Sequence, residues 1–338
     1  MSHWQEFLGA QGAEYQTDGT VTFPQATSPN NTDTWMTPLE HERLISLHGA
    51  KAQSFLQGQV TCDVRELSEQ RWRYGAQCNL KGRVMASFTL AAAGGDELLL
   101  KLSADLAQST RDNLHKYAVF SRVELAVDDQ RVVLGLSGPD ADRLISQHLG
   151  FAAPAAGEFT GSDKAVVLAL ENQRFELWIN SQAAPELWQV LSADCLPADT
   201  ALWQQQDIRA GVAKINTATA ERYTPQDLNY PLIDAVNFKK GCYTGQEVVA
   251  RLHYKATLKK RLYLIEGAGE VPAATAAVSN SDGKNRGEIV QALSQANGFI
   301  ALAVLPIDDA QSLYLQERDE PITRLDLPYA TAEADNSP

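Results

Sequence analysis

The chain has 338 residues, of which 44% are hydrophobic and 21% charged, a composition typical of a folded protein with a sizeable core and two or three domains. Its formal net charge is −13, from 29 basic and 42 acidic residues, which argues against general binding to a nucleic-acid backbone. No apolar run is long enough to cross a bilayer, and the N-terminus, MSHWQEFLGAQGAEYQ, lacks the basic and apolar regions of a secretory signal. We therefore expect a cytoplasmic protein with no membrane partner and no direct nucleic-acid partner.

The cysteines and histidines predict no metal site. The four cysteines are scattered without a C-x-x-C pair, and the six histidines do not stand at metal-ligand spacings. The pattern indicates reduced thiols. The sequence also contains no P-loop and no dinucleotide-binding fingerprint, which argues against a nucleotide site.

Helices and strands are predicted in alternation through about residue 200, after an irregular lead-in over residues 1–35. The first group consists of a short helix at 51–57, strands at 74–78, 83–90, 97–102 and 123–127, and a helix at 104–118. The second group consists of strands at 132–136, 165–170 and 174–179 and helices at 138–149 and 185–192. Its β-α-β-β-α order is typical of a ferredoxin-like unit, and a further helix is expected at 200–210.

From residue 261 the pattern changes to short strands separated by Gly, Asn and Asp turns. These strands are predicted at 261–266, 286–292, 299–304 and 312–316. With no helical period between them, they indicate a small antiparallel barrel or sandwich. The last residues, 329–338, predict a disordered tail.

The densest chemistry lies in KKGCYTGQE, residues 239–247. Thr244 and Glu247 have the spacing of a capping box, so we expect a helix to begin there. Cys242 then lies just before a helix N-terminus and beside two lysines, and both features favour a thiolate. The alternative, a small buried hydrophobic residue, is the usual state of a free cysteine, and we expect it for Cys62, Cys78 and Cys195.

The surroundings of this motif offer further candidates, each with a structural alternative. Residues 239–261 hold seven basic residues and only Glu247 as an acid, which indicates a site for an anionic small ligand or an acidic partner, or simply a solvated surface. Trp203 could form a wall of a slot for a flat heteroaromatic ring, or belong to the core. Gln226 could supply donors and acceptors to such a ring, and His253 could be a base or merely exposed.

The motif resembles a known signature. Residues 240–251 match K-G-C-Y-x-G-Q-E-x-x-A-R, the signature of the YgfZ family of folate-binding proteins, which are relatives of the T-protein aminomethyltransferase of the glycine cleavage system. Other blocks that resemble the family follow in the same order, at 55–61, 116–121, 224–226 and 327–329.

This resemblance implies an α+β fold in which T-protein-like, ferredoxin-like α/β subdomains surround a central channel, followed by a C-terminal antiparallel β-barrel. The implied divisions are 36–128 with a returning segment at 201–255, then 129–200, then 256–328. The channel would bind tetrahydrofolate, with Trp203 against the pterin. A second folate-site tryptophan of the family is replaced here by Glu42.

The resemblance also implies a role in assembling or repairing iron–sulfur clusters in client enzymes, including enzymes that modify tRNA. Cys242 is then the functional thiolate, and it would act transiently with iron–sulfur client or assembly proteins. We expect the folate to be bound by Trp203, Gln226, Lys240, Gln246 and Arg251, with the basic segment holding its glutamate tail.

The alternative function is folate-dependent aminomethyl or C1 transfer of the T-protein type. T-proteins carry two aspartates for this reaction, and the corresponding block here reads NLKGRVMAS, with Ala86 and Ser87 in their places. The sequence therefore favours a folate-binding accessory factor over a classical aminomethyltransferase. A redox-sensing adaptor with Cys242 as its reactive thiol and no folate remains a third possibility.

Overall fold

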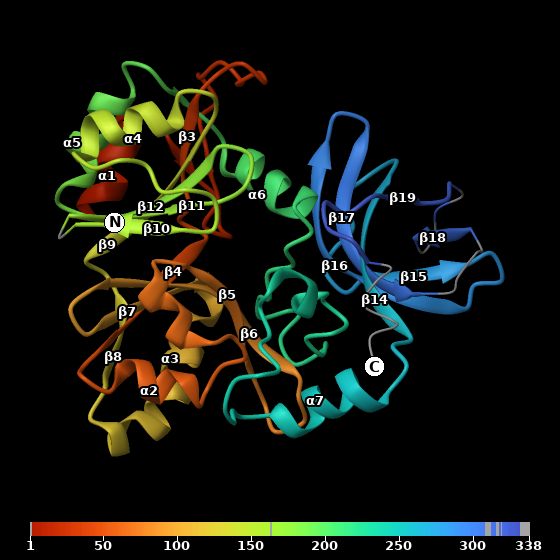
Figure 1. Cartoon of the computed structure of the whole chain (residues 1–338). Coiled ribbons are helices and arrows are strands. Elements are labelled where there is room, and N and C mark those ends of the chain that lie inside the picture. The colour runs from red at the N-terminus through yellow and green to blue at the C-terminus, as the bar shows by residue number, and fades with distance from the viewer. Residues whose placement is uncertain (1, 163, 308–311, 316–317, 319, 332–338) are drawn as a thin grey trace. The chain divides into compact units, whose positions relative to one another are not determined.

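The computed structural model describes residues 2–162, 164–307, 312–315, 318 and 320–331 (Figure 1). The chain divides into two compact units, each assembled from segments that are far apart in the sequence. The first unit contains the residues up to 56, 64–73 and 89–203, and the second contains 57–63, 74–88 and the residues from 204 onward.

A six-stranded sheet of the first unit has the order β10-β11-β12-β9-β3-β13. Its neighbouring strands are antiparallel except for β13, which pairs in parallel with β3. The strands are β3 Trp35–Pro38, β9 Arg131–Ser137, β10 Phe159–Gly161, β11 Ala165–Ala169, β12 Arg174–Asn180 and β13 Leu196–Pro197.

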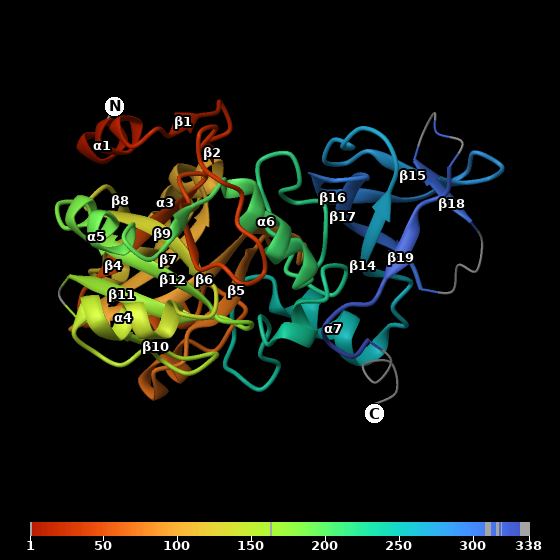
Figure 2. The same ribbon diagram turned by 90° about the horizontal axis from the view of Figure 1, so that it is seen from above.

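One face of this sheet is apolar and is covered by helices (Figures 1 and 2). Phe175, Leu177 and Ile179 of β12 lie in its core cluster, together with residues of the helices. Because side chains alternate along a strand, Arg174 and Glu176 belong to the opposite face. The covering helices are α1 His3–Ala10, α4 Ala141–Leu149 and α5 Ala184–Leu191.

Helix α1 lies where the sequence predicted an irregular lead-in, so that prediction was wrong for residues 3–10. The Ser2 hydroxyl accepts from the Gln5 backbone N–H at 3.2 Å, and the Gln5 side chain accepts from the Ser2 backbone N–H at 3.0 Å. Trp4 and Leu8 are buried against the core. Two buried positions in eight residues are too few for periodicity to indicate a helix.

A second sheet has the order β5-β6-β7-β4-β8. Strand β4 pairs antiparallel with both β7 and β8, and α3 packs on them. The strands are β4 Glu42–His48, β5 Arg73–Cys78, β6 Val84–Gly94, β7 Glu97–Ser103 and β8 Glu124–Asp128. The remaining elements here are α2 Ala52–Gln57, α3 Ala104–Ala118, the 3₁₀ turns η1 Val64–Glu69 and η2 Val119–Ser121, and the small pair β1 Glu14–Tyr15 and β2 Val21–Thr22.

The second unit carries a curled antiparallel sheet with the order β18-β15-β16-β17-β14-β19. The four strands predicted from residue 261 onward are confirmed, and the sequence missed β15 and β19. The strands are β14 Lys260–Gly267, β15 Ala277–Asn280, β16 Asn285–Gln295, β17 Gly298–Pro306, β18 Leu313–Leu315 and β19 Thr323–Leu325. The helical elements are α6 Thr200–Arg209, which crosses the division, η3 Tyr230–Ile233 and α7 Gln246–Lys255.

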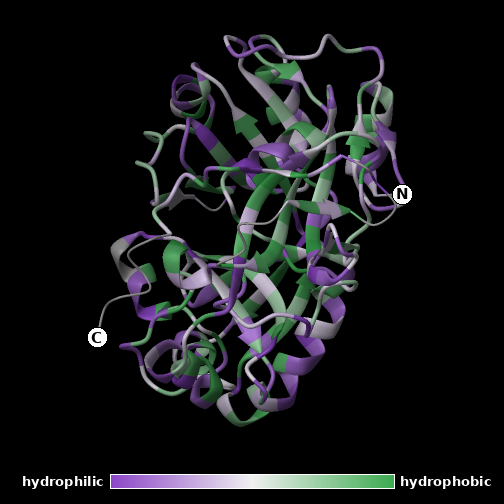
Figure 3. Cartoon of the chain, turned by 90° about the vertical axis from the view of Figure 1, so that its right-hand side faces the viewer, coloured by the Kyte–Doolittle hydropathy of each residue, from purple (hydrophilic) through white to green (hydrophobic). Residues whose placement is uncertain are grey.

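Figure 3 shows hydrophobic stretches along many of the strands, whereas β16, with the sequence NRGEIVQALSQ, is mixed in character. In the described part of the chain, no helix combines the length and apolar character that a membrane crossing requires.

The first residues of the predicted disordered tail are packed against the second unit. The Tyr329 hydroxyl donates to the Gly211 carbonyl at 2.9 Å, and an Arg261 N–H donates to the Thr331 carbonyl at 2.5 Å. The prediction was therefore wrong for residues 329–331, while residues 332–338 lie outside the described part.

Candidate functional site

Cys242 carries an exposed thiol, whereas Cys62, Cys78 and Cys195 are buried as predicted. Burial raises the pKa of the Cys78 and Cys195 thiols to about 12, so both stay protonated at neutral pH. Because a thiolate must be accessible to react, the fold leaves Cys242 as the cysteine suited to chemistry with another molecule.

The loop around Cys242 is anchored by its neighbour Lys240. The Lys240 side chain is 5% exposed, and its Nζ donates to the Val60 and Cys62 carbonyls at 2.6 Å each. Nζ also lies 5.2 Å from the ring centre of Tyr243, a buried residue. Lys240 and Tyr243, both buried, thus fix the loop to the interior of the unit, while the Cys242 thiol is exposed to solvent. The Lys240 ammonium is engaged with the protein's own backbone, and its contact with folate stays a prediction.

The predicted capping box was wrong, because the cap of α7 is Gly245 rather than Thr244. Gly245 has φ of 84° and makes no side-chain cap. A Cβ at this position would lie 2.5 Å from the Asn79 carbonyl oxygen and 3.1 Å from the Cys78 Cβ. Only glycine fits this left-handed, crowded position, so the helix begins at Gln246.

The other predicted residues of the second unit also gather around α7. Gln226 is buried, and its Nε2 donates to the Val249 carbonyl at 2.7 Å. The Gln246 backbone N–H donates to the Tyr243 carbonyl at 3.1 Å, while Arg251 is exposed on the helix. Gln226 therefore supports α7 from inside, and the assignment of these residues to folate binding stays a prediction.

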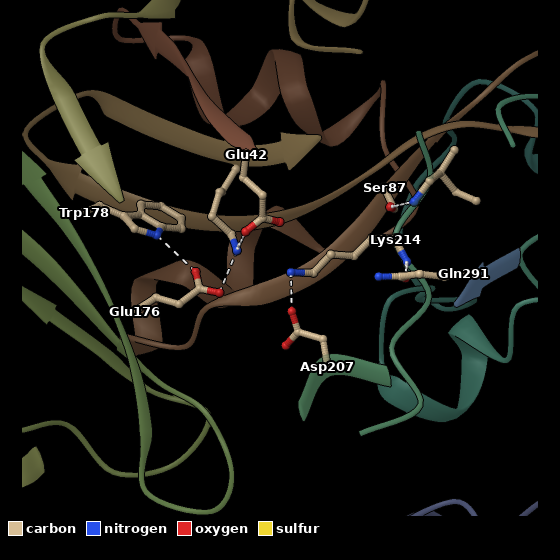
Figure 4. Close-up of polar contacts among 9 residues, drawn as sticks. Glu42, Ser87, Glu176, Trp178, Asp207, Lys214 and Gln291 are labelled. Carbon is tan, nitrogen blue, oxygen red and sulfur yellow. Dashed lines mark hydrogen bonds and ion pairs between the residues drawn. The ribbon is translucent and has the colours of Figure 1, made fainter. Parts of the chain in front are cut away.

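Ala86 and Ser87, which the resemblance aligns with two aspartates of T-proteins, lie on β6. Ala86 is buried, and the Ser87 hydroxyl accepts from the Ile215 backbone N–H at 2.9 Å (Figure 4). Lys214, the residue before Ile215, forms an ion pair in which its Nζ lies 2.6 Å from Asp207 Oδ2. Ala86 and Ser87 therefore provide no carboxylate for transfer chemistry.

Trp203 lies in the first unit and is completely buried, as the core alternative predicted. The Arg174 guanidinium carbon lies 4.1 Å from the ring centre, and Trp35 meets the ring edge-on at 6.2 Å. A Cβ on Gly135 would lie 2.4 Å from the ring atom Cε3, so the indole also packs closely on the backbone of β9. The indole Nε1 has no hydrogen-bond partner among the described residues.

The sequence did not reveal a buried ionic cluster of Glu42, Lys101 and Glu176 (Figure 4). Lys101 Nζ lies 2.5 Å from Glu42 Oε2 and 2.6 Å from Glu176 Oε1, and the Trp178 indole N–H donates to Glu176 Oε2 at 3.1 Å. A signal was present, because Lys101 and Glu176 interrupt apolar strands, in ELLLKLS and RFELWIN. Glu42, which the resemblance aligns with a folate-site tryptophan, thus has a fixed cationic partner.

These residues match a pterin in the kinds of groups they offer. Trp203 provides an unpaired buried N–H, and Arg174 and Glu176 lie two residues apart on the same strand face. Because the Trp203 ring is fully covered, a ligand reaches this N–H only after a neighbouring side chain moves.

Comparison with known proteins gives consistent matches. Residues 32–202 match the family model of the GCVT N-terminal domain. The tRNA-modifying protein YgfZ of Photobacterium profundum is 34% identical over 298 residues, 85% of this chain and 89% of that protein. The protein of the same name from Serratia proteamaculans is 30% identical over 93% of this chain and 98% of its own length.

Among solved structures, the glycine cleavage system aminomethyltransferase T of Bartonella henselae matches with a TM-score of 0.80. The match covers 96% of both chains at 17% sequence identity. At this identity the match describes the fold alone. It confirms the predicted T-protein-like α+β fold with its C-terminal antiparallel sheet.

Proposed function

This chain belongs to the family of the tRNA-modifying protein YgfZ, and on that premise we propose that it is a tetrahydrofolate-binding factor that assists iron–sulfur cluster assembly or repair. Its clients include tRNA-modifying enzymes that depend on such clusters, in keeping with the name of its relatives. The observation that carries this proposal is the exposed Cys242 thiol on a loop fixed by the buried Lys240.

The cysteine arrangement favours transient handling of a cluster over storage. A cluster is normally held by four ligands, most often cysteines. The other three cysteines are buried, and within the described residues no group of His, Cys, Asp and Glu side chains is arranged to hold a metal ion. A cluster or iron at Cys242 is therefore a substrate whose other ligands come from a partner protein.

The thiol role is tested in cells that lack the native gene and carry Cys242→Ser or Cys242→Ala. We expect both variants to lower the tRNA nucleosides made by cluster-dependent enzymes, measured by mass spectrometry of digested tRNA. Serine can still form hydrogen bonds but is a poor ligand for iron. If both variants lower the modified nucleosides equally, the role therefore belongs to the sulfur atom. Normal nucleoside levels in Cys242→Ala cells, with protein abundance matched to wild type, would reject the role.

For the folate part of the proposal, the supporting observations are the GCVT domain match and the unpaired Trp203 N–H beside Arg174. Trp203 and Arg174 would hold the pterin, which would supply one-carbon or redox chemistry when bound.

The folate site is tested by calorimetric titration of tetrahydrofolate into wild type and Trp203→Phe. Phenylalanine keeps an aromatic ring in the core but removes the N–H. We expect the dissociation constant to rise about tenfold, the effect of one lost hydrogen bond worth about 1.4 kcal/mol. Gln205→Ala, two residues further along α6, removes a side chain that donates to the Ser294 carbonyl; it is the control and should leave the constant unchanged. Absence of binding by wild type would defeat the folate proposal while leaving the thiol proposal standing.

A further inference from the structure

We propose that the surface around Cys242 docks an acidic segment of a client protein, one that also carries an apolar side chain. This docking face is defined by Leu80, Lys81, Lys239, Arg251, Tyr254 and Lys255. The inference rests on the proposed function, since it names the kind of partner that reaches the Cys242 thiol.

Packing within the second unit brings three segments to this face. The turn between β5 and β6 contacts α7, because a Cβ at Gly82 would lie 3.0 Å from Val248 and Gly245 lies against the Asn79 carbonyl. The tip of that turn therefore lies near the start of α7 and the loop that carries Cys242. Leu80 at the tip is 83% exposed. Tight turns usually carry polar residues or glycine, so an exposed leucine at this position is unusual.

Aromatic rings form the other end of the face. Phe238, from the Cys242 loop, stacks on His253 of α7 with ring centres 3.7 Å apart and an interplanar angle of 7°. Tyr254 meets His253 edge-on at 4.7 Å and is 63% exposed. The loop is thus fixed to the second half of α7, with an amphipathic ring at the surface. Exposed apolar and aromatic residues of this kind are typical anchors for a protein partner.

The face is positively charged in an acidic protein. Arg251, Tyr254 and Lys255 stand at positions i, i+3 and i+4, so they share one side of α7. Lys81 and Lys239 add exposed cations from the turn and the loop. In the described structure none of these four cations has a side-chain ion pair. The nearby carboxylates are Glu247 on the same helix and Glu221, which is bonded to Asn79.

Charge and apolar anchors together favour an acidic protein segment over RNA. Four cations are few for phosphate-backbone binding, and the net charge of −13 repels a polyanion as long as tRNA. Leu80 has no role in contacting phosphate, but it can enter an apolar pocket of a protein. Unpaired cations at the rim of such a contact raise the association rate of an acidic partner and select against basic ones.

The test uses the full chain and three peptides of equal length, each with one leucine and one cysteine activated as a mixed disulfide with thionitrobenzoate. The peptides are rich in Glu, Gln or Lys. When the Cys242 thiolate displaces thionitrobenzoate, the released chromophore reports the second-order rate. At low salt we expect the acidic peptide to react on the order of tenfold faster than the neutral one and the basic peptide slowest. The three rates should converge at high salt.

Charge reversal and a matched control locate the effect. The variant Lys239→Glu/Arg251→Glu/Lys255→Glu should invert the order of the peptides. Leu80→Ser should lower the rate of the acidic peptide several-fold without changing its salt dependence. The control is Lys284→Glu, in the turn between β15 and β16 and outside the docking face. It reverses one positive charge, as each substitution of the triple variant does, and it should leave the order of the three peptide rates unchanged.

Three outcomes would overturn the proposal. One is equal rates for all three peptides at low salt. Another is protection of Cys242 by a short uridine oligonucleotide at concentrations where free acidic peptide does not protect, which would assign the face to RNA. The third is protection by pteroylpentaglutamate but not by the free acidic peptide, which would assign the cations to the folate tail. The exchange assay uses neither cluster nor client, so its failure leaves the cellular test of Cys242 intact.

Discussion

Lys101 and Lys240 are both buried, but their ammonium groups have different kinds of partner. Lys240 directs its ammonium to two neutral carbonyls and keeps the neighbouring Cys242 at the surface. Lys101, which is 1% exposed, lies between two carboxylates and closes a polar cluster inside the first unit. A buried ammonium must be compensated in either way. The partners of a buried lysine therefore decide its role: the loop carbonyls around Lys240 give a rigid exposed site, and the strand carboxylates around Lys101 give an enclosed network.

The largest expected effect comes from removing the cation of the enclosed cluster. Lys101→Met leaves Glu42 and Glu176 buried without their shared partner, so the free energy of unfolding should fall by about 3–5 kcal/mol. Equilibrium urea unfolding measures it. Adding Glu42→Gln and Glu176→Gln to Lys101→Met should recover much of the loss, because the uncompensated charges are gone. An unchanged midpoint in Lys101→Met would contradict the cluster.

A smaller loss is expected at the exposed site. Lys240→Met removes two charge-assisted hydrogen bonds and should lower the free energy of unfolding by about 2–3 kcal/mol. Its neighbour Lys239 is exposed, so Lys239→Met is a matched control that should stay within about 0.5 kcal/mol of wild type. Equal effects of the two substitutions would show that Lys240 does not anchor the loop.

Two glycines of the Cys242 loop differ in the space around them. Gly245→Ala places a Cβ 2.5 Å from the Asn79 oxygen at φ of 84°, so we expect a loss of about 1–3 kcal/mol. Gly241 has no atom within 4 Å of a built Cβ, and Gly241→Ala should be nearly neutral. Differential scanning calorimetry of both variants checks the difference, and a neutral Gly245→Ala would refute the assigned cap.

The smallest effect concerns pH. Burial lowers the pKa of His253 below its ordinary value of 6.5, so the folded state favours the neutral ring stacked on Phe238. The resulting stability is present above pH 6.5 and is lost as the pH falls through the lowered pKa. His253→Gln should show a weaker loss of melting temperature on acidification than wild type. An NMR titration of His253 with a midpoint at or above 6.5 would contradict this.

The sequence alone separated Cys242 from the other three cysteines, and the structure agrees with that separation. The spacing of KGCYTGQE singled out Cys242, and scattered cysteines in apolar segments predicted the burial of Cys62, Cys78 and Cys195. Trp203 was harder to assign, because a tryptophan on an amphipathic helix is more often a core residue than the wall of a ligand site. The structure shows it buried, with Arg174 on its ring, a contact from a strand that the sequence does not relate to it.

The amino-acid sequence alone specifies the elements whose signals are local: the helix at 104–118, the strands from residue 261 onward and the motif around Cys242. Periodicity and turn residues act over a few positions, so they can be read directly. Only the tertiary structure decided the cap at Gly245, the anchoring of Lys240 and the Glu42–Lys101–Glu176 cluster. The Lys240 bond to Val60 spans 180 positions and the Lys101 bond to Glu176 spans 75. Whether a charge is solvated or buried depends on such distant partners, which no local pattern specifies.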